Sequence, residues 1–364
     1  MEQRQGVSVV ICCYNSAPRL PQTLRHLALQ RVPDHLPWEV VIVDNGSTDG
    51  TKEVAQAQWN MHAAPAPLRL IDSAPGLVAA RNEGLRSARH EFVIFCDDDN
   101  WLDADYVHIA HEVMSADADI GVLGGWGEAA FEAEPPPWFE GIEVYFAVGP
   151  QAEASGDVSE SKGYVYGAAF VVRKEAWLQV ARHDFASPLE SFRRGSNDKE
   201  LCSLIRLAGY KMWYEESLRF KHFLPASRLE WRRFLGHAYR AHKTAMLVEP
   251  FSYVLAREDY VSPSRWYWFK VASKHALWLL RRFRALLPPL NQEGSWARFR
   301  HACYQGKLAG WLHMRWRFKA HCDRIHALQL ALQAERTGVS RQTRSSARAP
   351  SRELEASATR RGDR

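Results

Sequence analysis

The chain has 364 residues, of which 46% are hydrophobic, with 14 Trp and a formal net charge of +5. This composition is typical of a globular protein, and at roughly 150 residues per domain the length fits one large domain with a second region. The sequence contains no uninterrupted run of about 18 apolar residues, so no membrane-spanning segment is expected. The six Cys form no CxxC pair, which favours reduced thiols over a disulfide framework. The short apolar run near the N-terminus is better explained as a first strand than as a signal peptide.

The charge is divided unequally along the chain. Residues 1–225 hold 20 Lys and Arg against 32 Asp and Glu, a net charge of −12, whereas residues 226–364 hold 27 against 10, a net charge of +17. The acidic front suits a metal-assisted reaction. The basic, Trp-rich back suits an anionic partner such as a lipid headgroup surface, a phosphorylated acceptor or nucleic acid. Because no recognised nucleic-acid-binding motif accompanies the charge, no nucleic-acid partner is expected.

Strands and helices alternate through the first part of the chain. Continuous apolar runs predict buried strands over 7–13, 38–44, 68–72, 91–96 and 119–124. The intervening segments predict helices over 18–30, 51–59, 77–88 and 104–115. This alternation predicts an α/β fold with an open, mainly parallel sheet and helices on both faces. In such sheets, ligands bind in the crevice beyond the carboxyl ends of the strands.

Polar residues follow three of these predicted strands. Tyr14 and Asn15 follow the first strand, the DNGSTDG turn at 44–50 follows the second, and three Asp at 97–99 follow the fourth. The turn taken alone is explained equally well as turn chemistry with a helix N-cap. Three adjacent carboxylates, however, repel one another and raise one another's pKa unless a cation lies between them. The three groups therefore predict a metal-dependent ligand site at one edge of the sheet.

Four motifs occur in series along this half of the chain: VSVVICCYNS, EVVIVDNGSTDGT, GLVAARNEGL and FVIFCDDDNWLD. In this order and spacing they resemble the nucleotide-sugar-binding half of glycosyltransferase family 2, whose fold is of the GT-A type. The resemblance continues through YVYGAAFVVRKEAW and SNDKELCSLIRLAGYKMWYEESLRFKHF and covers residues 6–224. It implies an enzyme that moves a sugar from a nucleotide-sugar donor to an acceptor hydroxyl.

The resemblance also implies which residues bind the donor. Tyr14 and Asn15 would line the nucleotide pocket, and Asp44 would hydrogen-bond the base. Arg81 and Asn82 would lie near the diphosphate and the ribose. The full implied donor set is Tyr14, Asn15, Asp44, Asn45, Arg81, Asn82, Asp97 and Asp98.

The acidic cluster resembles the metal-binding DxD motif of this family. The implied metal ligands are Asp99 first and Asp97 second, together with His222, and the implied cation is Mg²⁺ or Mn²⁺. Such hard cations prefer oxygen ligands and usually take substrate phosphates among them, so the cation would hold the nucleoside diphosphate and neutralise the leaving group. A His flanked by Phe, as His222 is, also fits a packed structural residue.

One carboxylate is implied on the acceptor side. Family members that invert the anomeric centre use a general base that usually lies in an acidic pair opening a helix. The matching pair here is Asn197 and Asp198, so Asp198 is the implied base and the first acidic position is an amide. The alternative is a carboxylate that is merely stabilised at a helix N-terminus. Gly167, in the segment GAA, resembles the family's small-residue approach to the acceptor, or else reflects strand packing.

The basic back half carries three predicted helical segments, 228–249, 264–287 and 296–333. The segment 264–287 places Trp266 and Phe269 among basic residues, which favours contact with an anionic membrane surface. A helical extension packed on the catalytic domain explains the same pattern. From Thr337 onward the chain has little apolar content, which is typical of disorder.

These observations define an expected organisation and function. We expect a GT-A catalytic domain over 1–225, divided near 124 into a nucleotide-sugar half and an acceptor half, a basic helical extension over 226–336 and a disordered tail over 337–364. The expected activity is metal-dependent, inverting sugar transfer to a cell-surface polysaccharide or lipopolysaccharide, or to its lipid-linked precursor, in the cytoplasm or at the inner face of the cell membrane.

Two other classes of protein remain open. A nucleotidyltransferase shares the α/β sheet and the acidic metal site, but it normally has a Gly-rich basic phosphate loop near the first strand, and ICCYNSAPRLP is not one. A non-catalytic module that binds nucleotide sugars is suggested only by Asn197.

Overall fold

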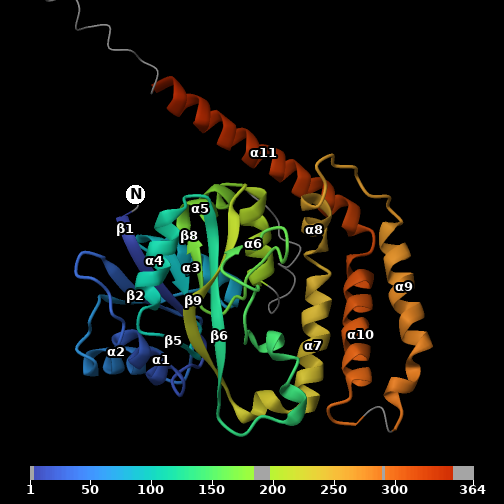
Figure 1. The fold of residues 1–364 in the computed structure, drawn as a ribbon, viewed down its shortest axis with the longest axis horizontal. Coiled ribbons are helices and arrows are strands. Elements are labelled where there is room, and N and C mark those ends of the chain that lie inside the picture. Colours follow the sequence, from blue (N-terminus) through green and yellow to red (C-terminus); the bar gives the residue numbers. More distant parts are fainter. Residues whose placement is uncertain (1–3, 184–196, 289–291, 347–364) are drawn as a thin grey trace, which may run out of the picture.

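A computed structural model describes residues 4–183, 197–288 and 292–346 of the chain. Its centre is a nine-stranded sheet with the order β3-β2-β1-β4-β8-β6-β9-β5, in which β7 pairs with β9 (Figure 1). The strands are β1 (Arg4–Cys13), β2 (Trp38–Asp44), β3 (Leu68–Asp72), β4 (His90–Phe95), β5 (Asn100–Leu102), β6 (Ile120–Phe131), β7 (Gly156–Asp157), β8 (Phe170–Arg173) and β9 (Lys211–Leu224).

The first four strands form the parallel part of the sheet that the sequence predicts. β1 pairs in parallel with both β2 and β4, and β2 pairs in parallel with β3. Helices cover both faces. One apolar core joins the sheet to α1 (Leu20–Ala28), α2 (Thr51–Met61) and α4 (Tyr106–Ala116), and the other joins it to α3 (Leu77–Ser87), α5 (Lys174–Ala181) and α6 (Asn197–Leu207). The parallel strands therefore present their carboxyl ends, and the loops that follow them, at one edge.

The second part of the sheet is mixed. β8 lies antiparallel between β4 and β6, whereas β6 and β9 pair in parallel and β5 pairs antiparallel with β9. The strand predicted over 119–124 continues to Phe131, because glycines within it admit very close backbone contacts. A Cβ on Gly125 would lie 1.9 Å from the carbonyl oxygen of Leu218.

The C-terminal half is helical, as predicted, but its helices are more numerous than the three expected segments. They are η3 (Ala226–Leu229), α7 (Trp231–Ala245), α8 (Glu249–Leu255), α9 (Tyr267–Arg281), η4 (Phe283–Leu286), α10 (Trp296–Met314) and α11 (Arg317–Ser346). The segment predicted over 296–333 is broken at Arg315, whose φ of 37° lies outside the helical range. Short 3₁₀ turns η1 (Pro137–Phe139) and η2 (Glu143–Phe146) precede this region.

The helix α11 runs past the expected start of the tail. It continues to Ser346, although we expected disorder from Thr337 onward. No proline interrupts the chain between the start of α11 and Ser346, and the first one beyond it is Pro350, so the backbone can continue the helix despite its polar composition. Residues 347–364 lie outside the described part of the chain.

The helical extension packs on the catalytic domain rather than forming a separate body. Buried side chains of α8 to α11 join Val180 and Leu207 of the catalytic domain in one apolar core. A second core joins α7 and α10 to Phe146 and to the end of β9. α7 lies nearest the sheet, α10 lies beside it and α9 lies outermost (Figure 1). Within the described ranges, the helices are all too short or too polar to cross a membrane.

Candidate active site

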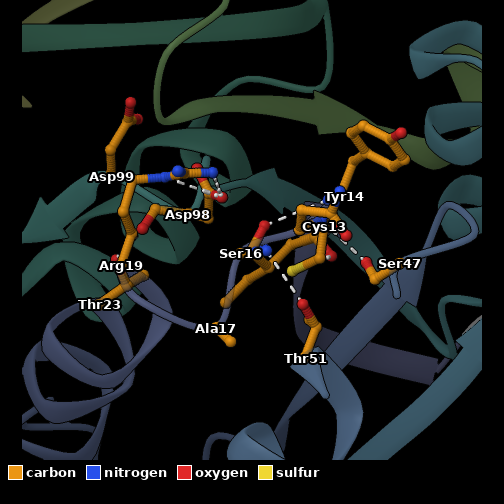
Figure 2. Close-up of polar contacts among 12 residues, drawn as sticks. Cys13, Tyr14, Ser16, Ala17, Arg19, Thr23, Ser47, Thr51, Asp98 and Asp99 are labelled. Atoms are coloured by element: carbon orange, nitrogen blue, oxygen red, sulfur yellow. Dashed lines mark hydrogen bonds and ion pairs between the residues drawn. The ribbon is translucent and has the colours of Figure 1, made fainter. Parts of the chain in front are cut away.

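The loops after β1 and β2 are tied together by side chains of the DNGSTDG turn. The backbone N–H of Asn15 donates to Ser47 Oγ at 3.0 Å, and the N–H of Ser16 donates to Thr51 Oγ1 at 2.9 Å (Figure 2). In return, the Asn15 side-chain oxygen accepts from the N–H of Thr48 at 2.9 Å. These contacts fit the turn interpretation of the motif, although Gly50 at the N-cap of α2 makes no side-chain capping bond. The motif fixes the edge of the cleft and occupies backbone donors of the first loop.

Asp44 and Asn45 belong to the same framework. Asp44 is 4% exposed and accepts from the N–H of Ser47 at 3.2 Å. The side-chain oxygen of Asn45 accepts from the N–H of Gly76 at 2.8 Å, which holds the start of α3 against the end of β2. Tyr14 is different, because it is 59% exposed and its ring extends away from this network (Figure 2). Its aromatic face is therefore accessible to a ligand.

Arg81 and Asp97 face each other in the cleft. Arg81, on α3, is 6% exposed and lies over two buried phenylalanine rings. Its Nη2 is 3.9 Å from Asp97 Oδ1 and donates to the carbonyl oxygen of Gly167 at 3.4 Å. Burial raises the pKa of Asp97 to about 6, although the charge of Arg81 opposes the shift. The neighbouring Asn82 is not among the described residues that line the cleft.

Asp98 is turned toward α1. Its Oδ2 accepts from Arg19 Nε at 3.2 Å and Nη2 at 2.5 Å, and its backbone carbonyl accepts from Thr23 Oγ1 at 2.7 Å (Figure 2). Its side chain is 14% exposed. Both Arg19 nitrogens donate to the same oxygen, which fastens the acidic cluster to the first helix. The donor-binding role of Asp98 stays a prediction.

Asp99 lies next to His222 and Arg228. His222 Nε2 is 3.6 Å from Asp99 Oδ1, and Arg228 Nη1 is 3.2 Å from Asp99 Oδ2. Burial favours a raised pKa for Asp99, but the neighbouring side chains of His222, Arg228 and Arg19 outweigh it and lower the pKa. Asp99 and His222 are almost fully buried, and His222 lines the cleft beside the Asp99 carboxylate.

Two of the three metal ligands implied by the sequence, Asp99 and His222, lie together at this corner. His222 Nδ1 lies 2.6 Å from the carbonyl oxygen of Phe146, so it carries the ring proton and leaves Nε2 as an acceptor. Arg228 Nη1 donates to that Nε2 at 2.8 Å. One imidazole nitrogen and one carboxylate thus converge on a position that a guanidinium approaches. Arg228 Nη1 contacts both groups, at 2.8 Å from His222 Nε2 and 3.2 Å from Asp99 Oδ2, so a cation held there would take the place of the guanidinium. Among the residues described, no group of three or more His, Cys, Asp or Glu is arranged to hold a metal.

Asp198 lies at the first turn of α6, against the backbone of Gly167. Its Oδ2 accepts from the Gly167 N–H at 3.2 Å. A Cβ at Gly167 would lie 2.7 Å from Asp198 Cβ, so the absence of a side chain there permits the contact. The side chain of Asn197 lies outside the described part of the chain. The close approach explains why this position holds Gly.

Arg81, Asp97, Asp198 and His222 line a cleft of about 420 Å³ between the sheet edge and α7. All four are expected from the sequence, and the other described lining residues of the cleft are Leu77, Tyr145, Phe146, Ala147, Gly167, Ala168, Arg228, Arg233, Phe234, His237 and Arg240. The cleft thus unites the expected base with the expected diphosphate-binding residues.

Sequence reasoning missed the contribution of the helical extension to this cleft. Arg228, Arg233 and Arg240 were read as part of a basic helix, with no link to the site. Their i, i+5 and i+12 spacing carries no motif, so no local signal could have found them. Only the packing of α7 against η2 and the end of β9 places them opposite the acidic cluster.

Comparison with known proteins finds relatives for part of the chain. Residues 8–177 match the family model described as Glycosyl transferase family 2. A cholesterol galactosyltransferase of Borreliella burgdorferi is 30% identical over 112 residues, which is 30% of this chain and 30% of that protein. A poly-beta-1,6-N-acetyl-D-glucosamine synthase of Staphylococcus epidermidis is 26% identical over 126 residues, 34% of this chain and 29% of that protein. The matches therefore span about a third of the length of these relatives.

A solved structure shares the fold over most of the chain. It is a mannosyltransferase from Pyrobaculum calidifontis in complex with GDP-Man and Mn²⁺, with a TM-score of 0.52 and 22% identity over 84% of this chain and 87% of that chain. The fold is that of the GT-A glycosyltransferases, as predicted. The matched segment, residues 8–177, belongs to glycosyltransferase family 2.

Proposed function

We propose that the chain is a metal-dependent, inverting glycosyltransferase that moves a sugar from a nucleotide-sugar donor to an acceptor hydroxyl. The observation that carries this proposal is the meeting of Asp198, Arg81 and Asp97 in one cleft, with Asp99 and His222 at its corner. These are the charges that the reaction needs: a proton acceptor on one side and a place for a diphosphate with its cation on the other.

Each residue has a chemical task in this proposal. Asp198 takes the proton from the acceptor hydroxyl as that oxygen bonds to the anomeric carbon. Arg81 lies where negative charge grows on the departing diphosphate and stabilises it. Asp99 and His222 Nε2 would hold Mg²⁺ or Mn²⁺, with Asp97 adjoining the substrate phosphates. A bound divalent cation supplies further neutralisation of the leaving group. Gly167 positions the base by donating to its carboxylate.

Nucleotidyl transfer is less well supported by the first loop. A phosphate loop offers successive backbone N–H groups to the phosphates. Here the N–H groups of Asn15, Ser16 and Ala17 already donate to side chains of the following turn, at 3.0, 2.9 and 3.0 Å. The loop is therefore built as a fixed edge of the cleft and lacks a phosphate cradle.

A test of catalysis separates the enzyme from a binding module. Wild-type chain with a nucleotide sugar and Mn²⁺ should release nucleoside diphosphate, by transfer or by slow hydrolysis. Asp198→Asn should bind the donor with little change and release far less nucleoside diphosphate. If the wild type binds a nucleotide sugar and never turns it over with any acceptor glycan, the binding module replaces the enzyme.

The acceptor we propose is a cell-surface polysaccharide or lipopolysaccharide, or a lipid-linked precursor of one. Two relatives support this class by their names, which are a cholesterol galactosyltransferase and a synthase of a poly-N-acetylglucosamine. Enzymes acting on such acceptors from the cytoplasm benefit from contact with the membrane surface, which concentrates enzyme and acceptor together.

The outermost helix suits peripheral binding to an anionic membrane. Phe269, Leu277 and Leu280 of α9 are 56%, 47% and 71% exposed. Their spacing of eight and three residues places them on one side of the helix. The exposed, positively charged side chains of Lys270 and Arg281 lie beside this apolar side. By contrast, other aromatic residues of the segment, such as the buried Trp268, pack inward. In such a helix the apolar side chains can enter the headgroup region of a bilayer, while the positive charges beside them attract anionic lipids.

A further inference from the structure

A second hollow opens on the acceptor side of Asp198. This groove, of about 780 Å³, lies between the start of α6, the segment 144–151, the segment 162–167 and α7. Asp198 and Gly167 line both the groove and the donor cleft. A molecule lying in the groove therefore has direct access to the carboxylate that we propose as the base.

The charge of the groove is positive. Lys162, Lys199 and Arg240 line it, whereas Asp198 is the only carboxylate among its described lining residues. Two histidines, His237 and His242, also line it, and burial followed by nearby cationic side chains lowers the pKa of each. Both imidazoles are therefore mostly neutral at pH 7, so the fixed charge of the groove comes from its lysines and its arginine.

Two of these cations are held close together around a single ring. The Lys162 ammonium lies 5.1 Å from the centroid of Tyr164 and 3.9 Å from that of Tyr166, and the Lys199 ammonium lies 4.2 Å from Tyr164. Burial, followed by the charge of Lys199, lowers the pKa of Lys162 to about 8. Within the described chain, neither lysine forms an ion pair with a carboxylate.

The position of Lys162 is fixed by a buried amide. Its ammonium donates to Gln151 Oε1 at 3.0 Å, and the same oxygen accepts from the N–H of Tyr166 at 2.7 Å. Gln151 is 8% exposed, and its amide nitrogen donates to the carbonyl oxygen of Gly125 at 2.8 Å. The structure thus holds a partly desolvated cation in place beside a second cation, which costs free energy unless an anion compensates it.

We propose that the groove binds the acceptor, and that this acceptor carries an oxyanion group, a phosphate or a carboxylate, which Lys162, Lys199 and Arg240 bind. This inference rests on the proposed sugar transfer and names the substrate class of the same site. Tyr145, Tyr164 and Tyr166 line the groove as well, and aromatic side chains with a polar end can contact a sugar. The groove then holds a charged sugar by its ring and its anion, with a hydroxyl directed at Asp198.

Binding of model sugars tests this directly. Full-length chain is first saturated with Mn²⁺ and the nucleoside diphosphate that stabilises it most, so that the donor cleft is filled. Glucose 6-phosphate, glucuronate, methyl glucoside and inorganic phosphate are then titrated by ligand-observed NMR. We expect at least one anionic sugar to bind about tenfold more tightly than methyl glucoside, because a charge-assisted hydrogen bond is worth that much. Comparison of glucose 6-phosphate with glucuronate decides between phosphate and carboxylate.

One double variant and one control variant test which residues bind the anionic group of the sugar. Lys199→Gln with Arg240→Gln should weaken the preferred anionic sugar about tenfold and leave methyl glucoside unchanged. Arg232→Gln is the matched control, because Arg232 is exposed on the same α7 helix and lines a different hollow. An equal loss in the control would show that only the general field of the helix is being measured, and would overturn the assignment.

Other outcomes also decide the proposal. Equal affinity for methyl glucoside and both anionic sugars, or no binding of either anionic sugar, overturns it. Inorganic phosphate that binds as tightly as glucose 6-phosphate shows a free-ion site and overturns the acceptor assignment. If no nucleotide stabilises the wild type, the proposed transfer fails instead, and the same titration without nucleotide still decides whether the groove prefers anionic sugars.

Discussion

Two regions of the site are built in different ways. The loops after β1, β2 and β4 form what we call the donor wall, and the lining of the groove forms the acceptor wall. On the donor wall, the side chains of Asn15, Asp44, Asn45 and Asp98 are hydrogen-bonded to neighbouring loops and to α1. On the acceptor wall, Lys162 and Lys199 have aromatic and amide neighbours without an ion-paired carboxylate in the described chain. The polar side chains of the donor wall therefore have hydrogen-bond partners within the protein. The lysines of the acceptor wall have no carboxylate partner in the described chain, so they are available to bind an anionic ligand.

The largest effect is expected where the two walls meet. Asp198→Asn keeps the shape of the side chain and its place at the start of α6 but removes the proton acceptor. We expect kcat to fall by about 10²- to 10⁴-fold, the usual contribution of a general base, with donor affinity little changed. Steady-state release of nucleoside diphosphate measures kcat, and a donor titration measures affinity. If donor affinity fell by the same factor as kcat, Asp198 would have a structural role and not that of the general base.

Two neighbouring carboxylates of the donor wall should behave differently. Asp99→Asn removes a proposed metal ligand, so Mn²⁺-dependent donor affinity should fall about tenfold to 100-fold, by analogy with the loss of groups that support a metal site. Asp98→Asn is the matched control. It weakens the pair with Arg19 and should lower the free energy of unfolding by about 1 kcal/mol, with Mn²⁺ dependence retained. Electron paramagnetic resonance of Mn²⁺ and chemical denaturation measure the two effects. Equal Mn²⁺ affinity in both variants contradicts the assignment.

The sequence predicts the loops of the donor wall because each loop is local, and the binding roles of their residues stay predictions. The strand ends, the DNGSTDG turn and the acidic cluster each lie within about seven residues, so turn chemistry and the family motifs specify them together. Asp98 is the exception. Its side chain pairs with Arg19, 79 residues earlier, and a distant partner leaves no mark in a motif. The acceptor wall joins Lys162, Lys199 and Arg240, which only tertiary packing brings to one groove.

The junction of the walls also depends on one backbone contact. Gly167→Ala places a Cβ 2.7 Å from that of Asp198, so one of the two must move. We expect overpacking to cost about 1–3 kcal/mol of unfolding free energy and kcat to fall by roughly tenfold, as misplaced groups lose proximity. Gly236→Ala is the control, because that glycine lies within α7 and alanine favours a helix by about 1 kcal/mol. Unchanged kcat in Gly167→Ala would show that the contact does not position the base.

The smallest expected effect concerns the outer surface of the extension. Arg281→Gln with Arg282→Gln should weaken binding to anionic vesicles about fivefold at physiological salt, since each base near a bilayer contributes about 1 kcal/mol before screening. Sucrose-loaded vesicle sedimentation measures it, and about 1 M NaCl should release the wild type. Arg86→Gln with Arg89→Gln, exposed on the catalytic domain, is the control and should change nothing. Wild-type chain that stays in the supernatant at low salt contradicts a membrane role for α9.

The central claim is that the cleft binds a nucleotide sugar through a divalent cation held by Asp99 and His222. Thermal unfolding with a panel of nucleotide sugars, with and without Mn²⁺, tests it most directly. A ligand at 100 times its Kd stabilises the folded chain by about 2.7 kcal/mol. We predict such stabilisation by one class of nucleotide sugar, only with Mn²⁺ present, and its loss in Asp99→Asn. Stabilisation that is equal without Mn²⁺, or absent with every nucleotide sugar, would contradict the claim.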